Sequence, residues 1–183
     1  MLLAGSVGLA QKKIDPSLGA AKAAACGACH GAAGTGSLPG VPFLAAQQAE
    51  FLVVQMFFLR EGLREVPQMK GLFNGWTDRD LEQVGAYFEN QPPPASVGPS
   101  DAQLHARGAA IAKGMGCGSC HLQNYAGQRQ VPRLANQRED YLAVSMTAFR
   151  ENKRPGADTQ MNGIMYKVPD ADIAALAHYL AHQ

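Results

Sequence analysis

Apolar side chains recur at helical spacing in two long segments of the chain. Phe51, Val54 and Phe58 illustrate the pattern in residues 50–60, and residues 140–150 carry its counterpart. Spacings of three and four residues place such side chains on one face of an α-helix. No long alternation of apolar and polar residues, which would indicate a half-buried β-strand, occurs in the sequence. The pattern therefore predicts an all-α fold.

Further helices are predicted on each side of these segments. Residues 18–25 and 104–113 are rich in alanine, which has the highest helix propensity. Near the end of each half, Thr77 precedes Asp-Arg-Asp and Pro169 precedes Asp-Ala-Asp. Acidic residues in the first turn interact favourably with the helix dipole, so both sites are expected to begin a helix.

The chain consists of two similar halves. The 24 residues that begin at Val41 and the 24 that begin at Val131 are identical at 11 positions. The residues from Met69 onward align without a gap on those from Met161. A shared order of motifs at nearly constant spacing indicates internal duplication.

A proline-rich segment separates the two halves. Consecutive prolines cannot continue a helix and favour an extended path. We therefore predict an N-terminal domain at 11–91, a linker at 92–100 and a C-terminal domain at 101–183. Residues 1–10 are similar to the end of a secretory signal peptide, with small residues before a plausible cleavage point.

Composition narrows the class of protein. Of the 183 residues, 46% are hydrophobic and 17% are charged, which is typical of a folded globular protein. The formal net charge of +1 argues against nucleic-acid binding. No apolar run approaches the roughly 18 residues that a transmembrane helix needs.

All four cysteines belong to two copies of one motif, Cys-x-x-Cys-His. The first copy is formed by Cys26, Cys29 and His30 in "CGACH". The second copy, "CGSCH", contains the corresponding residues Cys117, Cys120 and His121. No cysteine remains for a disulfide elsewhere, although each pair could form a local one.

Three chemistries use paired cysteines at this spacing. A thioredoxin-like dithiol needs a strand–helix context that the sequence lacks. A structural zinc ion needs four Cys or His ligands, and each copy offers three, with the histidine awkwardly adjacent to a cysteine. In covalent haem attachment, the two thiols bond to the porphyrin and the histidine binds the iron. Two copies at equivalent places favour haem, with His30 and His121 as iron ligands.

The second axial ligand of each iron decides the function. Methionine raises the reduction potential and suits an electron carrier. Met69 and Met161 correspond under the duplication and lie in polar segments before the last predicted helices, so we predict that they bind the irons. Met56 and Met146 fall in predicted helical stripes, and Met165, which has no methionine counterpart, is also expected to be a core residue. The remaining histidines, at positions 105, 178 and 182, are predicted to lie on the surface or on helix faces.

These motifs together resemble the dihaem class I cytochromes c, and most closely the cytochrome c4 family. The resemblance extends from about Leu18 to Gln183 and is carried by "CGACHG", "PGVPFLAAQ" and "MKGL" in the first half and by "CGSCH", "VPRLANQ" and "MNGI" in the second. It implies two class I cytochrome c domains related by a pseudo-twofold axis, with two haem c groups near each other. It further implies single-electron transfer in the periplasm, between a quinol-oxidising complex or a dehydrogenase and a terminal oxidase, and is compatible with peripheral membrane association.

The resemblance also assigns three supporting residues. Arg64 and Arg154 match a family position near the haem propionates, which need a charged partner when buried. Pro39 matches the proline whose carbonyl holds the iron-binding histidine, and Arg129 occupies the aligned position in the second half. Either another carbonyl serves His121, or His121 is held differently and the two haem potentials diverge.

Two other functions use the same motifs. The chain could be the cytochrome subunit of an oxidoreductase, such as a flavin-dependent sulfide dehydrogenase or an alcohol dehydrogenase, and a large exposed apolar surface would favour that role. A dihaem peroxidase or a thiosulfate-oxidising enzyme needs one haem without a methionine ligand, which the paired methionines argue against.

Overall fold

The computed structural model describes residues 14–36, 38–154 and 159–183. The signal-like segment at 1–10 lies outside these residues. Within the described part the chain is helical, and its only β contact is an isolated bridge between Gln128 and Val131. None of the helices in these ranges has both the length and the apolar character needed to cross a membrane. The predicted all-α class is confirmed.

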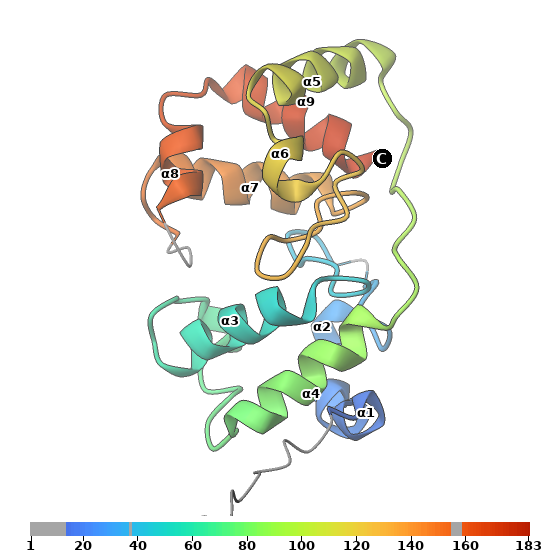
Figure 1. Ribbon diagram of the computed structural model, residues 1–183, viewed down its shortest axis with the longest axis vertical. Helices are drawn as coiled ribbons and strands as arrows, with labels where there is room; N and C mark the ends of the chain where they lie inside the picture. Colours follow the sequence, from blue (N-terminus) through green and yellow to red (C-terminus); the bar gives the residue numbers. More distant parts are fainter. Residues whose placement is uncertain (1–13, 37, 155–158) are drawn as a thin grey trace, which may run out of the picture.

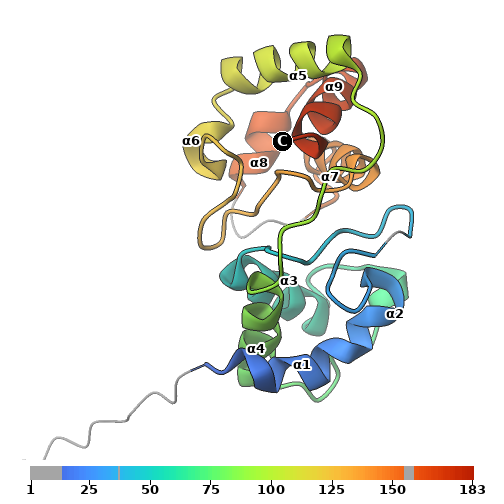
Figure 2. The same ribbon diagram turned by 90° about the vertical axis from the view of Figure 1, so that its right-hand side faces the viewer.

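The molecule consists of two lobes stacked along its long axis (Figure 1). The first lobe contains α1 (Pro16–Ala23), η1 (Ala24–Cys26), α2 (Gly27–His30), α3 (Ala49–Arg60), η2 (Pro67–Met69) and α4 (Asp78–Glu89). The second contains α5 (Ala102–Gly114), α6 (Gly118–His121), α7 (Glu139–Arg150), α8 (Gln160–Met165) and α9 (Asp170–Ala181). The segment between α4 and α5 runs along one side of the molecule from one lobe to the other (Figure 2).

Each lobe has its own hydrophobic core. Phe88, Leu81 and Val84 of α4 are at the centre of the first. Met165 and Leu176 are among the least exposed residues of the second. Met56 and Met146, each 7% exposed, also lie in these cores. The predicted packing role of Met56, Met146 and Met165 is therefore confirmed.

The last helix of each lobe begins where the sequence predicts. Thr77 caps α4, with its side chain accepting from the backbone N–H of Asp80 while the Asp80 carboxylate accepts from that of Thr77. Such a capping box contributes about 1 kcal/mol. Pro169 precedes α9, which carries Asp170 and Asp172 in its first turn.

Glycine allows the first and last helices of each lobe to cross in close contact. A Cβ atom at Gly19 would overlap the carbonyl oxygen of Gln83, and one at Gly108 would overlap that of Ala175. Both glycines are buried. These crossings fix α1 against α4 and α5 against α9. They thereby position the Cys-x-x-Cys-His motifs, because the first motif follows α1 in the chain and the second follows α5.

We expect Gly108→Ala to destabilise the protein by about 1–3 kcal/mol or more, because the added methyl group would also lie 2.5 Å from Cβ of Tyr179 and force the helices apart. Gly114→Ala, in the same helix, is the matched control, since its Cβ would meet no atom within 4 Å. Denaturant unfolding of both variants measures the difference. Equal stabilities would show that the crossing tolerates a larger residue.

Candidate haem-binding sites

Each Cys-x-x-Cys-His motif forms a single helical turn. The first follows α1 through η1 and ends with His30 at the end of α2, and the second ends with His121 at the end of α6. Residues three apart in a helical turn lie on the same face, so the two cysteines of a motif can reach one ligand together. The backbone after each histidine takes a positive φ, with Gly31 at 74° and Leu122 at 68°, and turns the chain back across the motif.

The cysteines are free thiols in the structure. Burial raises the pKa of Cys26 to about 11 and also raises the pKa of Cys117. A redox dithiol depends on a lowered thiol pKa, so these environments do not suit that chemistry. The two cysteines and the histidine of a motif also do not form a zinc site. Among the described residues, the only group whose ligand atoms lie close enough to share a metal ion is Glu139, His178 and His182.

Both motif histidines are buried and held by a prolyl carbonyl. Nδ1 of His30 lies 2.8 Å from the carbonyl oxygen of Pro42, and Nδ1 of His121 lies 2.9 Å from that of Pro132. A carbonyl oxygen can only accept, so Nδ1 carries the proton and Nε2 keeps a lone pair for a metal. Burial lowers the pKa of both histidines, and the bonds to the carbonyls offset only part of that effect. The neutral, oriented imidazole that iron ligation needs is therefore present twice.

The assignment of the holding carbonyl to Pro39 is wrong. Pro39 is exposed and occupies the tip of a turn in which the N–H of Val41 donates to the carbonyl oxygen of Leu38, with Gly40 at φ 71°. A Pro-Gly pair at the centre of a turn favours this geometry and leaves the proline facing solvent. Of the two alternatives for His121, the structure shows the first: another carbonyl holds it, and Pro132 serves His121 as Pro42 serves His30.

The two predicted methionine ligands lie beside the cores that hold the motifs. Met69 packs against the core cluster that contains Cys26, and Met161 packs, with Cys117, against the second core. Met69 ends the short helix η2, whereas Met161 lies in the first turn of α8 rather than in an irregular loop. Figures 1 and 2 show α6 and α8 in the same lobe, and in the sequence they lie on either side of α7.

Arg64 and Arg154 come together at the junction of the lobes. The guanidinium of Arg154 lies over the ring of Tyr141, 5.6 Å from its centroid, and Arg64 donates to Oε1 of Gln55 at 2.7 Å and interacts with Tyr141. Arg154 is 8% exposed, and its Nε is buried without a hydrogen-bond partner in the part of the chain that the structure describes. Across those same residues no carboxylate pairs with either cation.

The pKa values report a strongly positive environment around this pair. Burial and the neighbouring Arg154 lower the pKa of Arg64. Burial alone would raise the pKa of Tyr141, but the two cations and hydrogen bonds from Ser145 and Arg64 outweigh it and lower that pKa to about 8. One buried and one half-buried cation, together with an orphaned N–H, fit an anionic group such as a haem carboxylate.

His178 lies on helix α9, within the predicted range of surface or helix-face positions, but on the buried face of that helix. It is 5% exposed: Nε2 accepts from the backbone N–H of Asp101, and Nδ1 lies 3.0 Å from Oε2 of Glu139. It therefore ties the end of the interlobe segment to α7. Only the tertiary fold brings Asp101, Glu139 and His178 together, so no local signal in the sequence could have shown it.

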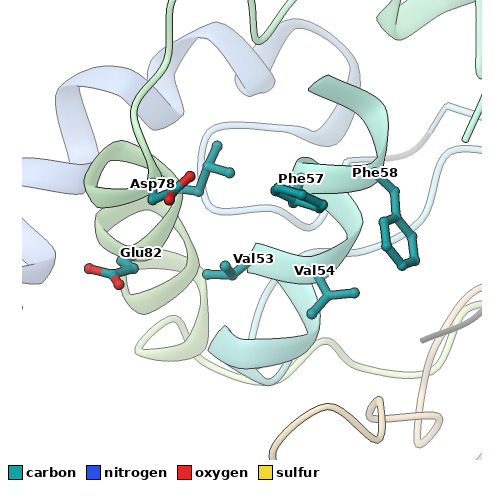
Figure 3. Close-up of a pocket in the computed structure, with 7 residues that line it drawn as sticks. Val53, Val54, Phe57, Phe58, Asp78 and Glu82 are labelled. Carbon is teal, nitrogen blue, oxygen red and sulfur yellow. The ribbon is translucent and has the colours of Figure 1, made fainter. Parts of the chain in front are cut away.

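An apolar groove lies on the surface of the first lobe, between α3 and α4 (Figure 3). It measures about 450 Å³ and is lined by Val53, Val54, Phe57, Phe58, Asp78, Leu81 and Glu82. Val53, Val54, Phe57 and Phe58 come from α3, while Leu81 and the two acidic residues come from α4. No motif cysteine or histidine lines this groove.

Comparison with known proteins agrees with this geometry. A profile of the cytochrome c family matches residues 105–183. The chain is 40% identical to cytochrome c4 of Pseudomonas aeruginosa, in an alignment that covers 98% of this chain and 94% of that one. It is 32% identical to a thiosulfate dehydrogenase electron acceptor of Stutzerimonas stutzeri, over 87% of this chain and 79% of the other.

The fold also matches a solved structure. The crystal structure of reduced recombinant cytochrome c4 from Pseudomonas stutzeri superposes with a TM-score of 0.86 at 32% identity, covering 92% of this chain and 98% of that chain. The chain has two similar helical lobes, each with a Cys-x-x-Cys-His turn, and it is similar to cytochromes c4 over nearly its whole length. The chain belongs to the cytochrome c4 family, and it is an electron-transfer protein that carries two haem c groups.

Proposed function

We propose that each lobe holds one haem between a motif histidine and a methionine. Cys26 and Cys29 anchor the first group, with His30 and Met69 as axial ligands. Cys117 and Cys120 anchor the second, with His121 and Met161 in the same roles. One observation supports the proposal most strongly: in each lobe, a prolyl carbonyl holds Nδ1 of a buried histidine. In the same lobe, the predicted methionine ligand and the first motif cysteine pack in or against one hydrophobic core. The boundary between the two units falls in residues 92–100.

Arg64 and Arg154 hold haem propionates in this proposal. Both cations lie at the junction of the lobes and lack a carboxylate partner among the residues that the structure describes. Burying a carboxylate is costly unless a charged donor meets it, and a guanidinium offers several donors in a fixed plane. The propionates would then face the junction from both sides.

The protein relays single electrons in the periplasm, from a quinol-oxidising complex or a dehydrogenase to a terminal oxidase. The haem iron carries the electron by changing its oxidation state, and the protein sets its potential and excludes water. A relative that is 32% identical is named as the electron acceptor of a thiosulfate dehydrogenase, which supports a dehydrogenase as donor.

Stopped-flow absorbance tests this relay. The oxidised protein is mixed with a quinol-oxidising complex and its quinol, or with a thiosulfate dehydrogenase and thiosulfate, and the reduced protein is then mixed with a terminal oxidase. We expect reduction by at least one donor and reoxidation by the oxidase. Failure of both exchanges would contradict the free-carrier role.

A subunit role in an oxidoreductase is the second candidate, and the apolar groove between α3 and α4 is the observation that favours it. Phe57, which lines the groove, is 38% exposed. The native protein would then elute from size-exclusion chromatography in a stable complex. Elution at the mass of a single chain, with its relay activity intact, would exclude this candidate.

We expect Met69→Ala and Met161→Ala each to remove half of the weak far-red absorption that reports iron–sulfur bonding. Each variant should also lower the reduction potential of one haem, because a methionine ligand raises it. Spectra of the oxidised and reduced proteins check the loss of the band, and a spectroelectrochemical titration measures the potential.

Met56→Ala and Met146→Ala are the matched controls for these variants. They remove core methionines, so they should cost about 2–5 kcal/mol of stability and leave the far-red band intact. A wild-type spectrum with only one band equivalent, or with none, would contradict methionine ligation of both irons.

Arg154→Gln should lower the potential of the second haem by tens of millivolts, because a nearby buried cation stabilises the reduced, less positive iron. Arg150→Gln removes the same charge nearby, at the last residue of α7, where the arginine is already paired with Asp170 at 2.6 Å. We expect a much smaller shift in that control. Equal shifts in a spectroelectrochemical titration would show that Arg154 acts only through net charge.

A further inference from the structure

Two corresponding glutamines join the lobes through a reciprocal set of hydrogen bonds. Gln137 of the second lobe accepts from the backbone N–H of Phe43 at 2.8 Å and donates to the Phe43 carbonyl oxygen at 2.9 Å. Gln47 of the first lobe accepts from the N–H of Arg133 at 2.7 Å and donates to its carbonyl oxygen at 3.1 Å. Both glutamines are buried, with 6% and 5% of their surface exposed. The loops that carry them meet between the lobes (Figure 1).

These glutamines bind the same peptide groups that hold the motif histidines. The peptide between Pro42 and Phe43 accepts at its oxygen from Nδ1 of His30 and donates from its nitrogen to Gln137. The peptide between Pro132 and Arg133 is bonded in the same way to His121 and Gln47. One peptide group and one side-chain amide therefore connect each histidine to the opposite lobe.

The surrounding donors fix the orientation of both amides. Oε1 of Gln137 also accepts from the N–H of Arg138 at 2.9 Å, and Oε1 of Gln47 accepts from that of Gln48 at 3.1 Å. Each oxygen thus faces two backbone donors, which the NH₂ group could not replace. The acceptor must point at the haem-supporting peptide.

We propose that Gln137 and Gln47 are positioning residues that each lower the reduction potential of the haem in the opposite lobe. This inference rests on the proposed ligation by His30 and His121. Hydrogen bonds in a chain polarise one another, so an acceptor at the peptide N–H makes the peptide oxygen a stronger acceptor. That oxygen then draws the proton of Nδ1 more strongly, and the imidazole becomes a better electron donor to iron. A better donor stabilises the oxidised iron.

The arrangement makes each potential depend on the docking of the two lobes. A partner that loosened the junction would remove both glutamines from their peptides and raise both potentials together. A substitution of one glutamine should act on one haem only, and on the haem that does not belong to its own lobe. This crossed effect distinguishes tuning through the peptide from a local structural change.

The test measures the two midpoint potentials of the full-length, haem-loaded protein by spectroelectrochemistry. NMR resonances of the haem methyl groups, assigned through contacts to residues of each lobe, identify which haem responds. Gln137→Leu should raise the potential of the haem at His30, with about a threefold change in its reduced-to-oxidised ratio, ~28 mV at 59 mV per tenfold. Gln47→Leu should do the same for the haem at His121.

Gln48→Leu is the matched control. Nε2 of Gln48 also bonds across the junction, to the carbonyl oxygen of Ala126 at 3.0 Å, but it touches neither of the peptides that hold the histidines. We expect both potentials to stay unchanged in this variant. A shift of both haems in Gln48→Leu would show that any weakening of the junction suffices and would overturn the crossed assignment.

The remaining outcomes are equally distinct. If Gln137→Leu shifts the haem of its own lobe, both haems equally, or neither, the inference fails while the proposed ligation stands. If the wild-type protein lacks two histidine–methionine haem spectra, the proposed ligation itself fails before any variant is compared. Either mirror variant suffices for the test should the other fail to fold.

Discussion

The bond from a buried histidine to a prolyl carbonyl is the constraint on which each lobe depends. It fixes the proton on Nδ1 and thereby frees Nε2, and it lies at the centre of a loop that must return to the motif. The loop is anchored by paired backbone bonds: the N–H groups of Leu44 and Ala45 donate to the carbonyl oxygen of Gly34. In the second lobe the N–H groups of Leu134 and Ala135 donate to Tyr125 in the same way. These anchors place Pro42 and Pro132 beneath the histidines although the two loops differ by one residue in length.

The same loops form the junction, so support of the histidines and association of the lobes cannot be separated. The interface is nearly isologous, because corresponding residues of the two copies exchange corresponding bonds. A buried amide costs free energy unless its donor and acceptor are both satisfied, and each glutamine meets that condition only when the lobes are docked in this register. The contacts therefore select one relative orientation, and the extended segment between α4 and α5 needs only to span the lobes.

Much of this organisation could be predicted from local patterns. The helical stripes, the acidic first turns and the Cys-x-x-Cys-His motifs each depend on residues within one or two turns, and their positions agree with the structure. The holding carbonyl could not be found that way, because the loop from His30 offers two prolines and only its tertiary course decides between them. The duplication contained a usable signal: Val-Pro recurs at 41–42 and 131–132, whereas Pro39 has no counterpart. His178 and the glutamine pair depend on contacts between distant segments, which periodicity does not report.

Because the two histidines are held in the same way, any difference between the reduction potentials of the two haems must come from other residues. The geometry at Pro42 and Pro132 is the same within 0.1 Å, so in the proposed ligation it would give both irons similar donors. The residue that follows each proline is not the same, since Phe43 is apolar and Arg133 is a cation. Burial lowers the pKa of Arg133, but an arginine stays protonated at neutral pH. In the proposed ligation, a charge fixed beside the peptide that holds His121 would oppose the oxidised iron of that lobe, and the uncharged Phe43 side chain would have no such effect on the other. The duplicated scaffold thus keeps the ligation constant while single positions around it separate the two sites.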